Sequence, residues 1–120
     1  AEIRTAYLLH RLAMGNQAPT PVDILELATG GGARLIGRPD LGSIEEGKAA
    51  DMFLVNADTL EWVGADLDPA SAPATIGLYR PVDYTIVAGK IVVKDGRLVN
   101  IEETAVARKS RELSRRLCRH

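Results

Sequence analysis

The chain has 120 residues, of which 46% are hydrophobic and 26% charged, and its formal net charge is −1. This length suits one small domain with a modest core, and the composition is that of a globular protein rather than a disordered one. Because the charges nearly cancel, no global field favours nucleic acid or an anionic membrane as a partner. No apolar run approaches the roughly 20 residues that cross a bilayer.

Cysteine usage and the N-terminal sequence bear on the compartment. Cys118 is the only cysteine, so no internal disulfide pair exists. The N-terminal residues carry no signal-peptide pattern. We therefore expect a cytoplasmic protein. A basic cluster near the C-terminus is interpreted as a solvated helix face; it comprises Arg108, Lys109, Arg111, Arg115, Arg116 and Arg119.

Two helices are predicted at the N-terminal end. Residues 1–14 carry apolar side chains at helical spacing, and Gly15 is a natural stop. In the second helix, Thr20 is a good N-cap, Pro21 suits the first helical position and Asp23 favours the positive end. Gly30, Gly31 and Gly32 either end this helix at Thr29 or lie where another backbone packs very close. We expect the helix to continue to about Ile36.

Short strands are predicted after this helix. Residues 52–55 form an apolar run typical of a buried strand, and residues 60–63 form a second candidate. Residues 84–87 and 91–93 are rich in β-formers and are joined by a tight hairpin at residues 88–90. The Asp95-Gly96 pair predicts a two-residue turn into a further strand at residues 98–99.

Two more helices complete the expected elements. Asp68 is expected to cap a short helix that runs from Pro69 toward Leu78. A terminal helix opens at Glu102 and Glu103 and ends among arginines, which suits the helix dipole.

The residues with possible catalytic chemistry are few and scattered. A metal site needs clustered ligands, but His10 and His120 lie at opposite ends of the chain. Cys118 is close to His120 in sequence, but both lie at the chain end, and chance explains this proximity better than a nucleophile–base pair. We therefore expect His10 to be structural or on the surface, and we assign no catalytic, cofactor-binding or metal-binding residue to this chain.

Two motifs invite a functional interpretation that we do not favour. The three glycines at residues 30–32 do not match a phosphate-binding loop, and close helix packing explains them better. Asp51 follows Lys48-Ala49-Ala50 and precedes an apolar run. We expect its carboxylate to accept nearby backbone N–H groups at the turn into the strand rather than to act as a catalytic acid.

Four phrases carry a family resemblance: EIRTAYLLHRL at residues 2–12, ATGGGARLIG at 28–37, GSIEEGKAADMFLV at 42–55 and VDYTIVAGKIVVKDGRL at 82–98. In this order and spacing they resemble the closing segment of metal-dependent amidohydrolases. The first phrase is similar to the chlorohydrolase and aminohydrolase branch, with an 8-oxoguanine deaminase-like protein as the nearest resemblance.

The resemblance implies a fold and a chemistry. Such enzymes are (β/α)8 barrels with a small β-sandwich built from both chain ends, and they hold zinc or iron with histidines and an aspartate. The metal activates water, which attacks a ring carbon and displaces ammonia. None of those ligands maps onto a residue of this chain. Zinc or iron is therefore expected in a full-length parent and no cofactor in this chain, which alone is expected to be inactive.

The resulting prediction is an α+β chain in three parts. Residues 1–37 are helices from the end of a (β/α)8 barrel, 38–101 are part of the composite β-sandwich, and 102–120 form a covering helix. The predicted function is the C-terminal portion of a deaminase of purine- or triazine-like rings. The alternatives are a free-standing non-catalytic assembly module, or the same portion of an imidazolonepropionase or cyclic amidase. The expected partners are the rest of such a chain or further copies in a homo-oligomer.

Overall fold

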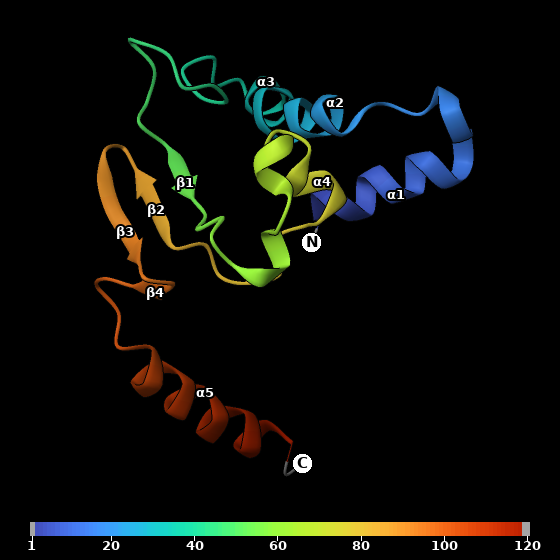
Figure 1. The fold of residues 1–120 in the computed structure, drawn as a ribbon. Helices are drawn as coiled ribbons and strands as arrows, with labels where there is room; N and C mark the ends of the chain where they lie inside the picture. The colour runs from blue at the N-terminus through green and yellow to red at the C-terminus, as the bar shows by residue number, and fades with distance from the viewer. Residues whose placement is uncertain (1, 119–120) are drawn as a thin grey trace.

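A computed structural model describes residues 2–118 and contains both helices and strands, as expected. Helices and a small antiparallel sheet lie side by side, and a last helix stands away from both (Figure 1). The α-helices are α1 (Glu2–Met14), α2 (Pro21–Glu26), α3 (Gly32–Leu35), α4 (Ala72–Thr75) and α5 (Glu103–Leu117). The strands are β1 (Met52–Leu54), β2 (Tyr84–Val87), β3 (Lys90–Lys94) and β4 (Arg97–Leu98). No described helix is long and apolar enough to cross a membrane.

The start of α2 is fixed by a reciprocal pair of side-chain hydrogen bonds. Asp23 N donates to Thr20 Oγ1 over 3.2 Å, and Thr20 N donates to Asp23 Oδ2 over 2.8 Å. Hydrogen bonds from the Thr20 hydroxyl and then from its backbone amide lower the pKa of Asp23. With Pro21 at the first helical position, this is the predicted capping arrangement, and it is confirmed.

The helix continues through the three glycines, as predicted, but not as regular α-helix. Residues Leu27–Gly31 form a π-helical turn between α2 and α3. A Cβ built on Gly42 would lie 2.8 Å from Gly30 Cα, so the chain at Gly42 packs directly on the helix backbone at Gly30. This close approach, anticipated as the reason for the glycines, explains Gly30; Gly32 faces open space.

The buried residues gather mainly where α4 meets α1 and α2. Those below a tenth exposed with apolar side chains are Ile24, Ala33, Ala65, Ala72 and Ala74. Only Ile24 among them has a large side chain. The radius of gyration is 17.9 Å, whereas a compact domain of this length has about 14 Å. The described residues therefore form a small local core and leave much apolar surface exposed.

The sheet has the order β1-β2-β3-β4 with every neighbouring pair antiparallel. Ala88 and Gly89 turn between β2 and β3, and Asp95 and Gly96 turn between β3 and β4, all four with positive φ. Such pairs of left-handed residues match the twist of two-residue hairpins, so both predicted turns are confirmed.

Three sequence expectations need correction. Residues 52–55 include a strand, but Phe53 and Leu54 are about half exposed because no second layer within residues 2–118 covers them. Leu60–Trp62 is a 3-10 helix rather than a strand, since Trp62 N bonds Thr59 O locally and forms no ladder.

The third correction concerns the short helix after Asp68. Asp68 Oδ1 accepts from Ser71 N over 3.3 Å and so bridges a turn, while Ser71 is the residue before the helix. The helix ends at Thr75 because Gly77 has a φ of +94° and its amide bonds Ala72 O. The helix is therefore shorter at both ends than the predicted one.

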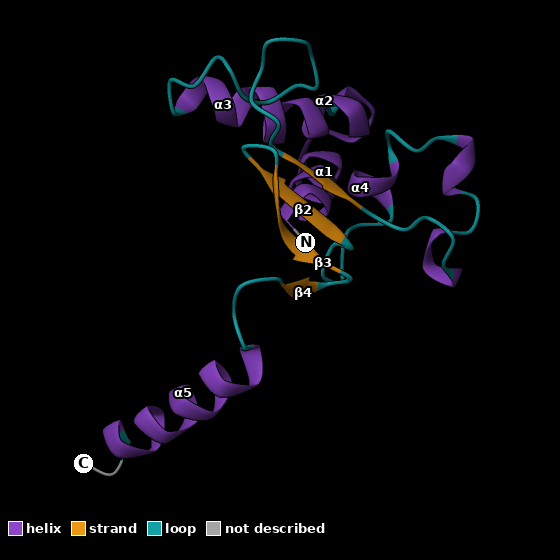
Figure 2. Ribbon diagram, turned by 90° about the vertical axis from the view of Figure 1, so that its left-hand side faces the viewer, coloured by secondary structure: helices purple, strands orange, loops and turns teal. Residues whose placement is uncertain are grey.

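Helix α5 is joined to the sheet at its first turn. Leu98 N donates to Glu103 Oε1 over 2.9 Å. Beyond that turn α5 runs away from the sheet, as both ribbon views show (Figures 1 and 2). Among residues 103–117 all side chains but that of Ala107 are exposed. A helix is therefore confirmed at the predicted place, over residues 103–117 of the predicted 102–120, and little of it is covered by the described chain.

Candidate functional site

The two longest signature phrases lie side by side in the structure. Residues 42–55 lead into β1, and residues 82–98 form β2, β3 and β4. Two hydrogen bonds join the phrases at one end. Ala88 N donates to Asp51 Oδ1 over 2.7 Å, and Gly89 N donates to Ala50 O over 3.0 Å. These bonds hold the β2–β3 hairpin against the start of β1.

Asp51 thus has the structural role that the sequence favoured, but with a different partner. The amide that it binds belongs to Ala88, 37 residues away, rather than to a neighbour in the turn. Ala88 has a φ of +48°, which is costly for a residue with a Cβ. The carboxylate therefore fixes a strained hairpin turn, a contact that no local pattern could reveal.

We expect Asp51→Ala to weaken folding without altering a chemical step. A lost hydrogen bond of this kind costs about 1 kcal/mol of unfolding free energy. Urea denaturation followed by circular dichroism measures the change, and Asp58→Ala, another exposed carboxylate, is the control. A longer enzyme carrying Asp51→Ala that lost turnover at an unchanged unfolding midpoint would contradict the structural role.

The loop before Asp51 is held by polar contacts of the first phrase. The Lys48 ammonium donates to Ser43 Oγ and lies 3.4 Å from a Glu45 carboxylate oxygen. Ala49 N donates to Asp40 O over 2.9 Å. Arg38 binds the Asp40 carboxylate, and this hydrogen bond lowers the pKa of Asp40. The charged side chains of this loop therefore stabilise its conformation through contacts with one another.

A small pocket of about 260 Å³ opens between residues 55–62 and 76–83. Its wall includes Trp62 and Tyr79, and its carboxylates are already engaged: Arg80 binds Glu61, and Asn56 N donates to Asp83 Oδ2 over 2.6 Å. The pKa of Glu61 is lowered first by a hydrogen bond from its own backbone, with a further contribution from the Arg80 charge. Both acids thus act as structural partners, Glu61 of Arg80 and Asp83 of the Asn56 amide, a role with no signal in the sequence.

His10 and Cys118, which lie in the described part of the chain, have separate environments. His10 Nδ1 lies 2.8 Å from Ala6 O on the preceding turn of α1, which requires the proton on Nδ1 because a carbonyl only accepts. Cys118 is exposed at the end of α5. His120 lies outside the described residues.

No group of three His, Cys, Asp or Glu side chains able to hold a metal occurs between residues 2 and 118. The side chains of this part of the chain therefore do not fit the metal centre that the resemblance implies for a parent enzyme.

The described fold thus consists of helices, with the loop at Gly42 packed against the helix backbone at Gly30, followed by a meander of four antiparallel strands. The profile of the amidohydrolase family matches residues 1–92. The chain belongs to the amidohydrolase family.

Similar proteins place it among enzymes of the expected branch. It is 42% identical over 118 residues to hydroxydechloroatrazine ethylaminohydrolase from Pseudomonas sp. strain ADP, covering 96% of this chain and 24% of the relative. It is 37% identical over 110 residues to 8-oxoguanine deaminase from Pseudomonas aeruginosa, covering 92% of this chain and 24% of the relative.

Solved structures agree with these relatives. Atrazine chlorohydrolase from Arthrobacter aurescens, complexed with zinc, superposes with a TM-score of 0.84 at 33% identity, over 93% of this chain and 25% of its own. An adenosine deaminase from Xanthomonas campestris with bound zinc gives 0.83 at 30% identity, over 99% of this chain and 27% of its own. The predicted resemblance is confirmed, and the chain spans about a quarter of the length of the proteins it matches.

Proposed function

We propose that this chain is the C-terminal portion of a metal-dependent amidohydrolase that deaminates a purine- or triazine-like ring. The observation that carries the proposal is the superposition on a zinc-containing triazine-ring hydrolase, with a TM-score of 0.84 over 93% of this chain. That hydrolase and the aminohydrolase and deaminase relatives share amine or halide displacement on an aromatic ring, according to their names.

In the proposed enzyme each part of this chain has a scaffold role. Residues 1–37 are helices that cover the barrel, residues 38–101 contribute to the composite β-sandwich, and residues 102–120 form a covering helix. The exposed apolar side chains support this division, since Leu12 is 85% and Leu35 88% exposed in the isolated chain. Large exposed apolar surfaces usually mark interfaces.

The reaction in the proposed enzyme is a hydrolytic displacement. A water oxygen bonds to the ring carbon that carries the amine, the carbon–nitrogen bond breaks, and the nitrogen leaves as ammonia after it gains a proton. The catalytic groups and a zinc or iron ion belong to the rest of the enzyme. This chain contributes the rigid support behind them, in particular the hairpin that Asp51 locks.

The enzyme is expected to assemble into a homo-oligomer, because a sheet with two open edges and one uncovered face recruits further strands or surfaces. Strands β1 and β4 are the edges of the described sheet. In the proposed enzyme the remaining strands of the sandwich cover part of this surface, and other copies cover the rest.

A direct comparison of two proteins tests the proposal. The purified 120-residue chain is expected to bind no stoichiometric metal and to release no ammonia from purines or triazines. A longer protein that continues upstream of Ala1 into the ligand-bearing barrel is expected to do both. Elemental analysis and an ammonia-release assay provide the readouts.

Either of two outcomes would overturn the proposal. Turnover by the 120-residue chain with metal bound to it would place the active site here. A longer protein that holds metal but hydrolyses only imidazolone or cyclic-amide substrates would assign the chain to another branch of the family.

A further inference from the structure

The first turn of α1 is bound to the residues that end and follow α4. Arg4 Nε donates to Thr75 O over 3.0 Å, although the two residues are 71 positions apart in the sequence. The guanidinium carbon of Arg4 lies 5.8 Å from the centroid of the Tyr79 ring, a distance at which a cation is attracted to the face of an aromatic ring. One side chain of α1 thus makes two separate contacts with residues 75–79.

Gly77 makes room for both contacts. It is buried and has a φ of +94°. A Cβ built on Gly77 would lie 2.9 Å from Arg4 Cδ and 3.0 Å from Tyr79 Cε2, whereas carbon atoms pack best at about 3.5–4.0 Å. A side chain at position 77 would therefore push Arg4 and Tyr79 away. We call Arg4, Gly77 and Tyr79 the clamp.

The clamp joins α1 to the best-packed part of the described chain. Ala72 is 1% and Ala74 0% exposed, and α4, to which they belong, packs on both α1 and α2. Figure 1 shows α4 beside the N-terminal end of α1. Arg80, just after the clamp, binds Glu61 and so holds the chain that leaves it. The support that Arg4 binds is therefore fixed by contacts on several sides.

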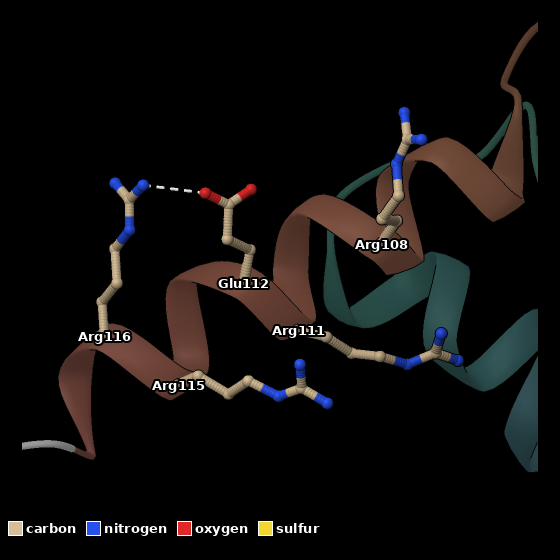
Figure 3. A pocket seen from close by; sticks show the side chains of 5 residues that line it. All are labelled: Arg108, Arg111, Glu112, Arg115 and Arg116. Carbon is tan, nitrogen blue, oxygen red and sulfur yellow. Dashed lines mark hydrogen bonds and ion pairs between the residues drawn. The ribbon is translucent and has the colours of Figure 1, made fainter.

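Arg4 differs in this respect from the arginines of the last helix. Figure 3 shows Arg108, Arg111 and Arg115 projecting from α5, and no ion pair found among residues 2–118 engages them. Arg4 also has no carboxylate partner within residues 2–118, but a carbonyl oxygen and an aromatic ring fix the direction of its side chain. It therefore connects two elements that are distant in the sequence.

The clamp lies at the end of α1 that is nearest to the reaction in the proposed enzyme. In a (β/α)8 barrel the loop between each strand and the N-terminus of the next helix lies at the catalytic face. In the proposed enzyme α1 is among the helices that cover the barrel, so the first turn of α1, which contains Arg4, directly follows such a loop. Contacts that hold this turn in place consequently hold the end of the loop as well.

We propose that Arg4 is a positioning residue of this enzyme. With Gly77 and Tyr79 it fixes the first turn of α1 and, through that turn, the catalytic-face loop that precedes Glu2. The inference rests on the proposed function and adds to it a residue that acts on the reaction only through the loop. A misplacement of about 1 Å at the reacting groups can lower a rate by roughly a hundredfold, so the contribution of such a residue is measurable.

Arg4→Met in the longer protein that continues upstream of Ala1 tests the role. Methionine keeps the apolar stem but removes the donor and the charge. The assay is ammonia release from 8-oxoguanine or an amino-substituted triazine, whichever the wild-type protein turns over faster. The variant is expected to lower kcat by about tenfold to a hundredfold and to change KM by less than about threefold, because positioning of the reacting groups acts in the transition state.

Two control variants separate the clamp from general effects. Arg11→Met makes the same substitution in the last turn of α1, at an exposed residue away from the clamp, and is expected to leave kcat and KM unchanged. Gly77→Ala should lower kcat as Arg4→Met does, and the double variant should lose no more than either alone, since both remove one shared contact. Gly64→Ala is the control for Gly77→Ala, because Gly64 has a φ of +85° but nothing lies within 4 Å of its Cβ position.

Amide hydrogen exchange of the longer protein distinguishes a positioning role from a loss of overall stability. In Arg4→Met the peptide that carries the loop before Glu2 is expected to exchange roughly tenfold faster than in the wild type, because the loop opens locally. The peptide that carries β2 and β3 is expected to exchange at the wild-type rate, since the clamp does not contribute to the strand pairing.

The possible failures can be told apart. A wild-type longer protein that turns over neither substrate would overturn the proposed function and this inference with it. If the wild type is active, three results would overturn the inference alone: an unchanged kcat in Arg4→Met, an equal loss in Arg11→Met, or faster exchange throughout the protein. A raised KM at constant kcat would also overturn it, because it would assign Arg4 to substrate binding.

Discussion

Gly42→Ala is expected to destabilise the chain by about 3 kcal/mol or more. The new Cβ would lie 2.8 Å from Gly30 Cα and 3.0 Å from both Gly30 N and Ala33 Cβ, and two of these three atoms belong to a helix backbone that cannot turn away. Overpacking of this kind costs about 1–3 kcal/mol. The φ of Gly42 is +92°, and a left-handed residue with a Cβ adds about 1–2 kcal/mol.

Gly47→Ala is the matched control for the backbone contribution. Gly47 lies in the same loop with a φ of +84°, but nothing lies within 4 Å of its Cβ position. Its cost should be limited to the conformational part, about 1–2 kcal/mol. Urea unfolding followed by circular dichroism compares the two variants, and equal losses would show that the contact between Gly42 and Gly30 contributes nothing.

Gly32→Ala completes the series in the opposite direction. Gly32 is helical and its Cβ would meet open space, so the alanine is expected to stabilise the chain by about 0.5–1 kcal/mol. The three variants together separate steric contact, backbone conformation and chain entropy as reasons for glycine in two neighbouring phrases of the sequence, at residues 28–37 and 42–55. A loss of stability at Gly32→Ala would mean that the face of the helix is covered in solution.

The sequence predicted those parts of the fold that depend on neighbouring residues. The cap at Thr20 and Asp23, and the turns at Ala88-Gly89 and Asp95-Gly96, rest on chemistry within three or four residues and are confirmed. Burial was mispredicted for Phe53 and Leu54, because an apolar run shows what a strand prefers, but not whether a second layer of protein is present to cover it.

The contacts between distant residues could not be predicted in the same way. Asp51 reaches Ala88, and Asn56 reaches Asp83, across 37 and 27 residues respectively. Nothing local to either residue specifies such a partner, although the strand order of a meander brings both pairs to adjacent strand ends. No catalytic residue was assigned to this chain, and the chemistry of a parent enzyme was inferred only through family resemblance. In the structure His10 Nδ1 contacts Ala6 O on α1, and Cys118 is exposed at the end of α5.

Ile24→Ala is expected to have the other large effect, a loss of about 2–4 kcal/mol. Ile24 is 3% exposed and is the only large side chain among the buried apolar residues of the described chain. It lies on α2, which packs on α4 and α1. Removing its side chain leaves a cavity in the one place where the helices close on each other, and the measured quantity is the unfolding free energy of the 120-residue chain.

Leu12→Ala removes the same number of atoms as Ile24→Ala, but from an exposed side chain. Leu12 is 85% exposed on α1, so in the 120-residue chain its truncation should change the unfolding free energy by less than about 0.5 kcal/mol. In the proposed enzyme the same side chain packs on the barrel, and its loss should approach the cost of a buried leucine, about 2 kcal/mol or more.

Comparing the effect of Leu12→Ala in the 120-residue chain and in the longer protein decides whether the apolar face of α1 is exposed or buried in the whole enzyme. A large loss in the longer protein alone would establish that the rest of the enzyme covers this face. A negligible loss from Leu12→Ala in both the 120-residue chain and the longer protein would contradict the barrel assignment of residues 1–37. The result for Ile24→Ala would not rescue that assignment, because α1, α2 and α4 of this chain already enclose Ile24.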